Sequence, residues 1–308
     1  MTQNLQTLPS EIKVFQRGWL SANNILFAGT DDTAVVDTGY HTDAAETVAL
    51  VEQALGERPL DRILNTHLHS DHCGGNAALQ ARWPGAQTTI PPGQLAQVRD
   101  WDPVALSYEP TGQFCPRFRA DGVLKPGTET DLGGRSWQIH AAPGHDPHAV
   151  VLFQPDLRLM ISGDALWENG FGVVFPELEG KHAFAQVAAT LDLIASLAPT
   201  TVIPGHGRVF DDIPGALARA RARLAGFEAD PVKHALHAAK VLLKYKLIEW
   251  RSQPLDDAYV WLSRTAYFQR VHQRFFGAAD RRAWFEQLVQ SLAQSGALRL
   301  QDGVLLDV

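Results

Sequence analysis

The chain has 308 residues, of which 45% are hydrophobic and 20% charged, as is typical of a globular protein with a large core. No run of about 18 apolar residues is present, and the first six residues lack the basic and apolar segments of a secretory signal. Two cysteines, Cys73 and Cys115, are too few for a disulfide scaffold. We therefore expect a cytoplasmic enzyme.

The charge is unevenly distributed along the chain. Residues 215–308 carry 14 Lys and Arg against 9 Asp and Glu, a net +5, whereas the preceding part carries 13 against 25, a net −12. This asymmetry predicts two modules, which we place at residues 1–212 and 213–308, and it weakly indicates an anionic substrate. A solvated helical surface rich in Arg and Lys would give the same pattern.

The first part of the chain predicts short strands and then alternating helices and strands. Polar turns separate the first three strands, and each of these strands is rich in apolar residues. The predicted elements are strands at 11–18, 24–29 and 33–37, a helix at 43–55, a strand at 62–65, a helix at 75–83, a strand at 87–90 and a helix at 91–98. Consecutive hairpins followed by such alternation predict two mixed sheets enclosed by helices.

Residues 100–120 have no clear periodicity but are rich in aromatic side chains, as in a lid or pocket wall. Side chains packed onto the domain surface would look the same. Strands are then predicted at 136–141, 149–153, 157–161 and 201–203, with a helix at 183–197.

The part after residue 212 is predominantly helical. Helices are predicted at 218–224, 231–245, 255–262 and 281–295, and two short strands at 297–306 surround the hairpin signal Asp302-Gly303. Helices followed by a terminal hairpin resemble a winged-helix module.

The densest group of reactive side chains lies in residues 66–75, at the end of a predicted strand. His67, His69, Asp71 and His72 are all residue types that bind a divalent metal such as zinc. His67 and His69 are two positions apart, so both rings point to one side of an extended strand. Asp71 and His72 follow a turn and can reach a second point nearby. A polar turn with surface histidines is the alternative, but it suits one histidine better than this cluster.

Three further candidate ligands follow apolar strands later in the chain: His145, Asp164 and His206. A glycine directly precedes each of them and permits a sharp turn at the strand end: Gly144, Gly163 and Gly205. Any one of these would be an ordinary turn residue, but the repeated pattern predicts a common cleft.

Together these motifs resemble the metallo-β-lactamase-fold hydrolase superfamily. The matching residues, in the order of that family, are His67, His69, Asp71, His72, His145, Asp164 and His206. The resemblance runs from about residue 11 to about residue 210. It implies an α+β fold, a four-layer αββα sandwich with the site along one edge of its sheets, followed here by the small winged-helix-like domain.

The resemblance also implies two divalent metal ions, Zn²⁺ in the first place, with iron or manganese as alternatives. One ion would be held by His67, His69 and His145, and the other by Asp71, His72 and His206, with Asp164 bridging the two. Paired metals lower the pKa of a bound water from about 15.7 to about 7, so a bridging water or hydroxide can act as the nucleophile.

Two other side chains near the ligands have alternative interpretations. Asp37 matches a family position behind the ligands, where it would fix the tautomer of a ligand histidine, or it caps a turn. Asp71 is in addition the candidate catalytic residue. Cys73 could offer a thiolate, but Asp164 already occupies the position where some family β-lactamases have cysteine, so we expect Cys73 to pack as a small buried residue.

The aspartate at position 164 argues against a dedicated β-lactamase. In the family, aspartate there accompanies glyoxalase II-type thioesterases, lactonases and RNA- or phosphodiester-cleaving members. The segment 165–175 is aromatic and apolar, so we expect hydrolysis of an ester, thioester or lactone of a small molecule. The candidate substrate contacts are Trp167, Phe171 and Trp101.

An endoribonuclease or phosphodiesterase is the main alternative, with the C-terminal module binding nucleic acid. The basic residues available for this are Arg219, Arg221, Arg223, Lys240, Lys244 and Lys246. Nucleic-acid-binding proteins usually have a concentrated basic face and a high pI, so an overall pI of 5.9 gives this alternative little support. A non-catalytic binding protein and a single-iron redox enzyme related to sulfur dioxygenases are further alternatives. We expect no membrane association, and a homodimer is compatible with this interpretation.

Overall fold

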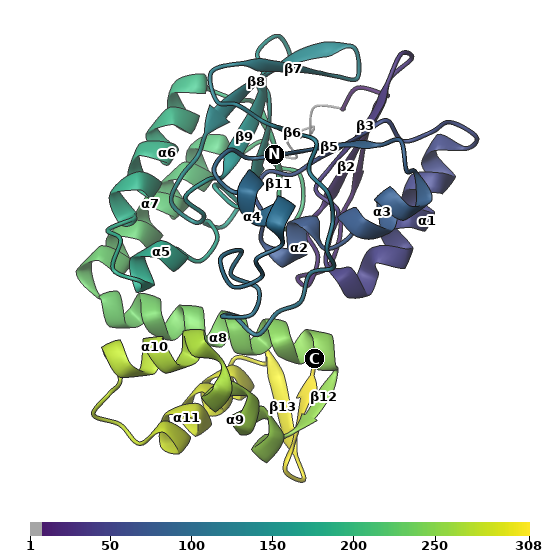
Figure 1. Cartoon of the computed structure of the whole chain (residues 1–308). Helices are drawn as coiled ribbons and strands as arrows, with labels where there is room; N and C mark the ends of the chain where they lie inside the picture. The colour runs from purple at the N-terminus through teal and green to yellow at the C-terminus, as the bar shows by residue number, and fades with distance from the viewer. Residues whose placement is uncertain (1–7) are drawn as a thin grey trace.

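The computed structural model describes residues 8–308, in which two β-sheets face each other and helices cover their outer surfaces (Figure 1). The first sheet has the strand order β1-β2-β3-β4-β5-β6 and the second β11-β10-β9-β8-β7. This confirms the predicted αββα sandwich. The first six residues, on which the expectation of no secretory signal rests, lie outside the described residues.

Both sheets are mixed, as predicted. In the first, β1 to β3 pair antiparallel and β3 to β6 pair parallel; in the second, β7 to β10 pair antiparallel and β10 pairs parallel with β11. The strands of the first sheet are β1 (Ile12–Phe15), β2 (Asn24–Ala28), β3 (Thr33–Val36), β4 (Arg62–Leu64), β5 (Gln87–Ile90) and β6 (Gly122–Val123). Those of the second are β7 (Glu129–Leu132), β8 (Arg135–Ala141), β9 (Val150–Gln154), β10 (Leu159–Gly163) and β11 (Thr201–Pro204).

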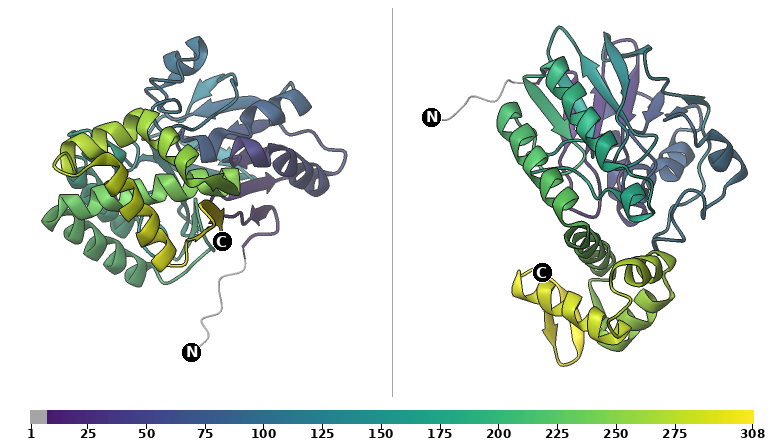
Figure 2. Two further views of the ribbon diagram at one scale, coloured as in Figure 1. Left: turned by 90° about the horizontal axis from the view of Figure 1, so that it is seen from below. Right: turned by 90° about the vertical axis from the view of Figure 1, so that its left-hand side faces the viewer.

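Three apolar layers hold the sandwich together. Between the sheets lies a core that includes Phe27, Trp137 and Ile161, all fully buried. Helices α1 (Ala44–Leu55) and α3 (Asn76–Arg82) cover the first sheet. Helices α6 (Phe184–Leu197) and α7 (Ile213–Ala229) cover the second, on the opposite flank of the molecule (Figure 1, Figure 2).

Helix α7 belongs to the packing of the sandwich. Asp212 caps its first turn by accepting a hydrogen bond from the Gly215 N–H. Its apolar face, including Leu217 and Leu224, joins the same core cluster as α6. We therefore propose that the C-terminal part begins with α8, at residue 231, and not at residue 213.

Short helices and one long irregular segment complete the part of the chain before α8. The short helices are η1 (His41–Asp43), α2 (Ser70–Cys73), α4 (Leu95–Asp100) and α5 (Phe175–Leu178). Helix α4 begins later than the predicted residue 91, after the turn at Pro91–Gly93. Residues 101–121 form no helix or strand, which agrees with their lack of periodicity.

The C-terminal part has the helix and hairpin arrangement of a winged helix, as predicted. It consists of α8 (Pro231–Trp250), β12 (Ser252–Pro254), α9 (Leu255–Arg264), α10 (Ala266–Phe275), α11 (Arg281–Gln294), β13 (Leu298–Gln301) and β14 (Val304–Asp307). The hairpin turns at Asp302 and Gly303, both at positive φ, as its Asp-Gly sequence requires. Helix α8 lies between the sandwich and the other C-terminal helices (Figure 1). Among residues 8–308, no helix has the length and apolar character that crossing a membrane requires.

Candidate metal centre

The predicted ligands meet because their strands end at one edge of the sandwich. β3 and β4 run parallel, so Asp37 and His67 emerge at the same end of the first sheet. β8, β10 and β11 share one direction in the second sheet, and the loops after them carry His145, Asp164 and His206. The alternative of isolated turn residues is therefore inconsistent with the structure.

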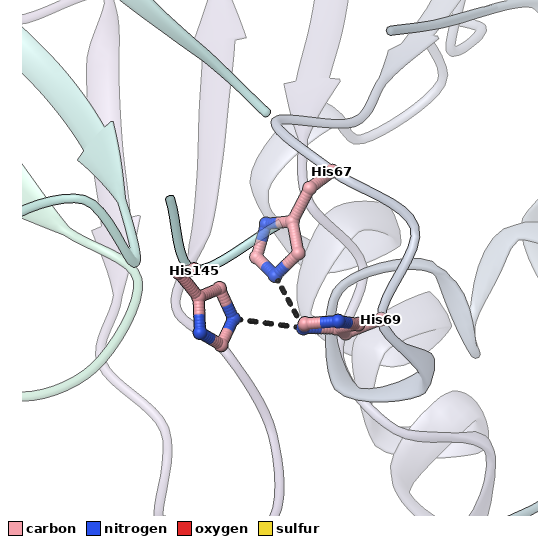
Figure 3. A group of neighbouring side chains, drawn as sticks. All are labelled: His67, His69 and His145. Carbon is pink, nitrogen blue, oxygen red and sulfur yellow. Dashed lines mark hydrogen bonds between the residues drawn. The ribbon is translucent and has the colours of Figure 1, made fainter. Parts of the chain in front are cut away.

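The first candidate triad consists of His67, His69 and His145 (Figure 3). The Nδ1 atom of His69 lies 3.1 Å from Nε2 of His67 and 2.7 Å from Nε2 of His145. Two nitrogens bound to one tetrahedral zinc at about 2.0–2.1 Å would lie roughly 3.3 Å apart. The three rings thus present their nitrogens to a common point at close to the spacing that one ion needs.

The second triad consists of Asp71, His72 and His206, and Asp164 lies between the two triads. The Oδ2 atom of Asp164 faces Nε2 of His145 at 3.4 Å. Its Oδ1 atom faces Nε2 of His72 at 3.3 Å and Nε2 of His206 at 3.9 Å. One carboxylate oxygen is therefore directed to each triad, which is the arrangement that a bridging ligand requires.

Hydrogen bonds to other groups fix the ligand rings. Asp37 is 1% exposed, and its Oδ2 atom lies 2.8 Å from Nδ1 of His72. The same carboxylate accepts hydrogen bonds from the N–H and the hydroxyl of Thr66. Nδ1 of His145 lies 2.6 Å from the Val173 carbonyl oxygen. The bond of His72 to Asp37 and that of His145 to Val173 each place a proton on Nδ1, which leaves Nε2 of the same ring free to face the centre.

Two of the predicted glycines are required for different reasons. Gly163 has φ +49°, and a Cβ there would also lie 2.8 Å from the Thr66 hydroxyl. Gly205 has no positive φ, but a Cβ there would collide with Oδ1 of Asp164 and lie 2.8 Å from the His72 ring. The first glycine permits the turn after β10, and the second permits close approach of the backbone to the ligands.

The donor set fits divalent metal ions electrostatically as well as geometrically. Burial, reinforced by neighbouring histidines, holds the pKa of His67 well below its usual value and lowers that of His145 to about 4, so their nitrogens keep lone pairs. Nε2 of His72 is buried and has no hydrogen-bond partner among the described residues. Three carboxylates lie close by, and none has a described Lys or Arg within 4.0 Å: Asp37, Asp71 and Asp164. Cations at this point would bind the free histidine nitrogens and would neutralise the carboxylates.

We expect Asp37→Ala to weaken metal binding by roughly 10–100-fold, because His72 would lose the group that orients its ring. Stability should also fall by about 1–3 kcal/mol, since two buried Thr66 donors would lose their acceptor. Competition with a metal-binding dye and thermal unfolding measure the two effects. Unchanged metal affinity in a folded variant would contradict the positioning role of Asp37.

A cavity of about 960 Å³ opens beside the two triads. Its lining includes His69, Asp71 and Trp167 from the sandwich and Tyr245 from α8. Trp167 contacts the ring of His206 at 5.4 Å, and its indole N–H donates to Oδ1 of Asp164. Trp167 therefore lines the cavity, and its role as a substrate contact stays a prediction.

The structure places the other two predicted substrate contacts elsewhere. Phe171 is 2% exposed and packs against Phe227 beneath its loop. Trp101 packs against Tyr108 and Phe118 in a separate apolar cluster, and neither residue lines the cavity. An aromatic residue in a loop can serve either the core or the cavity, and only the fold of the loop decides which.

Trp19 is an aromatic wall residue that the sequence did not reveal. It is 62% exposed, stacks on His206 with ring centroids 5.5 Å apart, and contacts Trp167 edge to face. It lies in the turn between β1 and β2, where no motif marks it. Cys73, by contrast, is fully buried, and its Sγ points to the hydroxyl of Tyr108 at 3.2 Å.

The fold and this paired His/Asp centre define a class of metal-dependent enzymes, and comparison with known proteins agrees. Residues 17–206 match the Metallo-beta-lactamase superfamily. The chain belongs to this superfamily.

Its curated relatives include hydroxyacylglutathione hydrolases. That of Anaeromyxobacter dehalogenans (strain 2CP-C) is 35% identical over 211 residues, which cover 66% of this chain and 71% of the relative. That of Dechloromonas aromatica (strain RCB) is 34% identical over 169 residues, covering 55% of this chain and 51% of the relative. The chain thus spans between about half and seven-tenths of the length of these relatives.

Among solved structures, a metallo-beta-lactamase family protein of Thermus thermophilus matches nearly the whole chain. It has a TM-score of 0.56 at 19% identity and covers 96% of this chain and 98% of its own. The protein TTHA1623, solved in a di-iron-bound form, has a TM-score of 0.54 at 26% identity and covers 68% of this chain and 98% of its own. The first match extends the shared fold through the C-terminal part.

Proposed function

We propose that the chain is a binuclear metal-dependent hydrolase that cleaves thioesters of small molecules. The observation that carries this proposal is the position of Asp164 between two complete ligand triads at the mouth of a cavity. The similarity to hydroxyacylglutathione hydrolases supports the thioester as the bond cleaved. We propose Zn²⁺ as the bound metal; the di-iron form of TTHA1623 makes iron the alternative to test.

In this mechanism the chain positions the metal ions and the attacking water. Metal ions held by the triads would lower the pKa of a water and polarise the thioester carbonyl. His67, His69 and His145 would hold the ion on one side of the centre. Burial restricts the rings of His67 and His145, and the hydrogen bond to the Val173 carbonyl also fixes His145. Asp71, with Oδ2 3.0 Å from Nε2 of His206, is the carboxylate we assign to the second side and to orienting the attacking water.

Aromatic rings border both triads and suit an apolar acyl group. Trp19 and Trp167 contact His206, and Phe175 contacts His69 and His145 at 5.3 and 5.8 Å. Such surfaces gain free energy when they bury an acyl chain, at about 25 cal/mol per Å².

The nucleic-acid alternative has less support, because most of its candidate side chains are engaged within the protein. Four of the six have acidic partners: Arg219 with Asp212, Arg221 with Asp192, Lys244 with Asp307 and Lys246 with Glu249. A continuous free basic face is therefore absent from these residues, whereas phosphate-backbone binding depends on such a face.

We expect the purified protein to contain two metal ions per chain and to hydrolyse thioesters in preference to lactones and phosphodiesters. Metal analysis and a panel of the three substrate types measure this directly. Removing the metal with a chelator should abolish turnover, and adding Zn²⁺ should restore it. Turnover confined to phosphodiesters would refute the proposal.

A further inference from the structure

Two cations on the cavity wall have no acidic partner. Six Lys and Arg side chains line the cavity, and four of them are ion-paired: Lys181 and Arg270 with Glu179, Arg208 with Glu168, and Lys244 with Asp307. Within residues 8–308, the other two, Arg223 and Lys240, have no carboxylate within 4.0 Å. They are also the two members of the predicted basic set that remain unpaired.

Arg223 is held against the loop that follows Asp164. It projects from α7, and its Nη1 atom lies 3.5 Å from the Phe171 carbonyl oxygen. A Cβ on Gly170 would lie 2.7 Å from the centre of the guanidinium, so the group is in close contact with the loop. It is half-buried, and burial lowers its pKa, yet a guanidinium remains charged near pH 7. Partial burial of a cation without a counter-charge costs free energy, which an anionic ligand would offset.

Lys240 lies on the facing helix, α8, and is similarly free of acidic neighbours. Its described side-chain contact is the Ser291 hydroxyl, 3.4 Å from Nζ. His237 lies one helical turn earlier, on the same face of α8, and its ring contacts Phe227 of α7 at 5.6 Å. Arg223 lies one helical turn before Phe227 on α7, so this ring contact joins the turn of α7 after Arg223 to the turn of α8 before Lys240. Burial, then Arg223 and Lys240, lower the pKa of His237 to about 4, so its imidazole is neutral near pH 7. The cavity wall thus carries two positive charges without acidic partners, together with one neutral imidazole.

We propose that Arg223 and Lys240 bind a phosphate group on the thiol that leaves when the thioester is cleaved. Two cations match a phosphate monoester, which carries about −1.5 to −2 charges at pH 7, better than a single carboxylate. Arg offers a planar pair of donors and Lys a compact charge, the combination that recurs in phosphate sites. The aromatic rings beside the triads suit the acyl group, which leaves the charged wall to the thiol.

This inference rests on the proposed function and adds its substrate class: thioesters of a phosphorylated thiol carrier, such as coenzyme A. Both cations lie beyond residue 206, outside the part of the chain that matches the superfamily. The proposed phosphate site would therefore be built by α7 and α8, outside the matched residues.

Three acyl thioesters with one acyl group and different thiols test the inference: coenzyme A with phosphates, glutathione with carboxylates, and N-acetylcysteamine with no charge. We expect kcat/KM to be highest for the coenzyme A thioester. Arg223→Gln and Lys240→Gln should each lower it roughly tenfold for that substrate, because a tenfold loss is about 1.4 kcal/mol, close to what a hydrogen bond to a charged group contributes. Turnover of the neutral thioester should stay within about twofold.

Arg221→Gln is the matched control, because Arg221 lies on α7, pairs with Asp192 at 2.8 Å and does not line the cavity. It should leave all three activities unchanged. Arg223→Lys keeps the charge and should recover part of the lost activity, which a purely structural effect would not do. Calorimetric titration with free coenzyme A measures binding independently of turnover.

The outcomes separate the two proposals. Failure to cleave any thioester would refute the proposed function, and unaltered coenzyme A binding in both variants would refute the phosphate site. If glutathione thioester were preferred and the variants reduced only its turnover, the cations would bind carboxylate, and the phosphate inference would be wrong.

Discussion

His69→Ala should reduce hydrolysis at least roughly a thousandfold, because the metal that its triad holds supplies several kcal/mol of transition-state stabilisation. Nδ1 of His69 lies between the nitrogens of His67 and His145, so its removal leaves two donors where an ion needs three. The side chain is 17% exposed at the cavity, so truncation creates little buried void and the fold should persist. Steady-state turnover, metal content and circular dichroism measure these three effects.

His140→Ala is the matched control for this experiment. His140 lies on β8, four residues after the start of the predicted strand, and contacts Gln138 instead of the triads. It should retain both metals and full turnover. Near-normal turnover of His69→Ala would exclude His69 from the metal centre.

Asp164→Asn should lower the metal content below two ions per chain and reduce kcat/KM by about a hundredfold or more. The amide keeps one oxygen, which can still accept the Trp167 indole N–H, but it cannot offer an anionic oxygen to both triads. It also removes one of the three negative charges, those of Asp37, Asp71 and Asp164, that favour cations here. The loss should therefore appear first as weaker binding of the second ion.

Titration of the metal-free protein with Zn²⁺ distinguishes this effect from a general loss of affinity. The wild type should bind two ions, and Asp164→Asn should keep one site of nearly normal affinity, because the histidine triad remains intact. Asp192→Asn, which removes an exposed carboxylate on α6 paired with Arg221, should behave as wild type. Two tight sites in Asp164→Asn would show that Asp164 does not bridge.

The C-terminal part contributes to the same cavity as the candidate metal ligands. Helix α8 crosses beneath the sandwich, and the Tyr245 hydroxyl donates to the Leu20 carbonyl oxygen at 3.0 Å (Figure 1). Tyr40 in turn donates to Glu249 of α8 at 2.9 Å. These bonds attach α8 to the loops around the ligands, so the wall that bears Lys240 is held in place relative to the metal centre.

The sequence by itself determined the sandwich, the winged-helix-like end and the set of candidate ligands. Their signals are local: strands that end in a glycine and a polar residue, as at Gly163-Asp164, and an Asp-Gly turn at residues 302–303. Backbone preferences and metal-ligand chemistry act over a few residues, so the printed order of residues carries them.

Only the tertiary structure decided which aromatic and charged side chains face the cavity. Trp19 lies over His206 while Phe171 turns into the core, and α7 packs on the sandwich although it follows the predicted boundary. Arg221 and Arg223 are two positions apart on α7 and point to different neighbours. Arg221 pairs with Asp192 of α6, whereas Arg223 contacts the Phe171 carbonyl oxygen and has no acidic partner among the described residues. Such contacts join residues far apart in the chain, and packing sets them, because a side chain's partner is fixed only when distant elements meet.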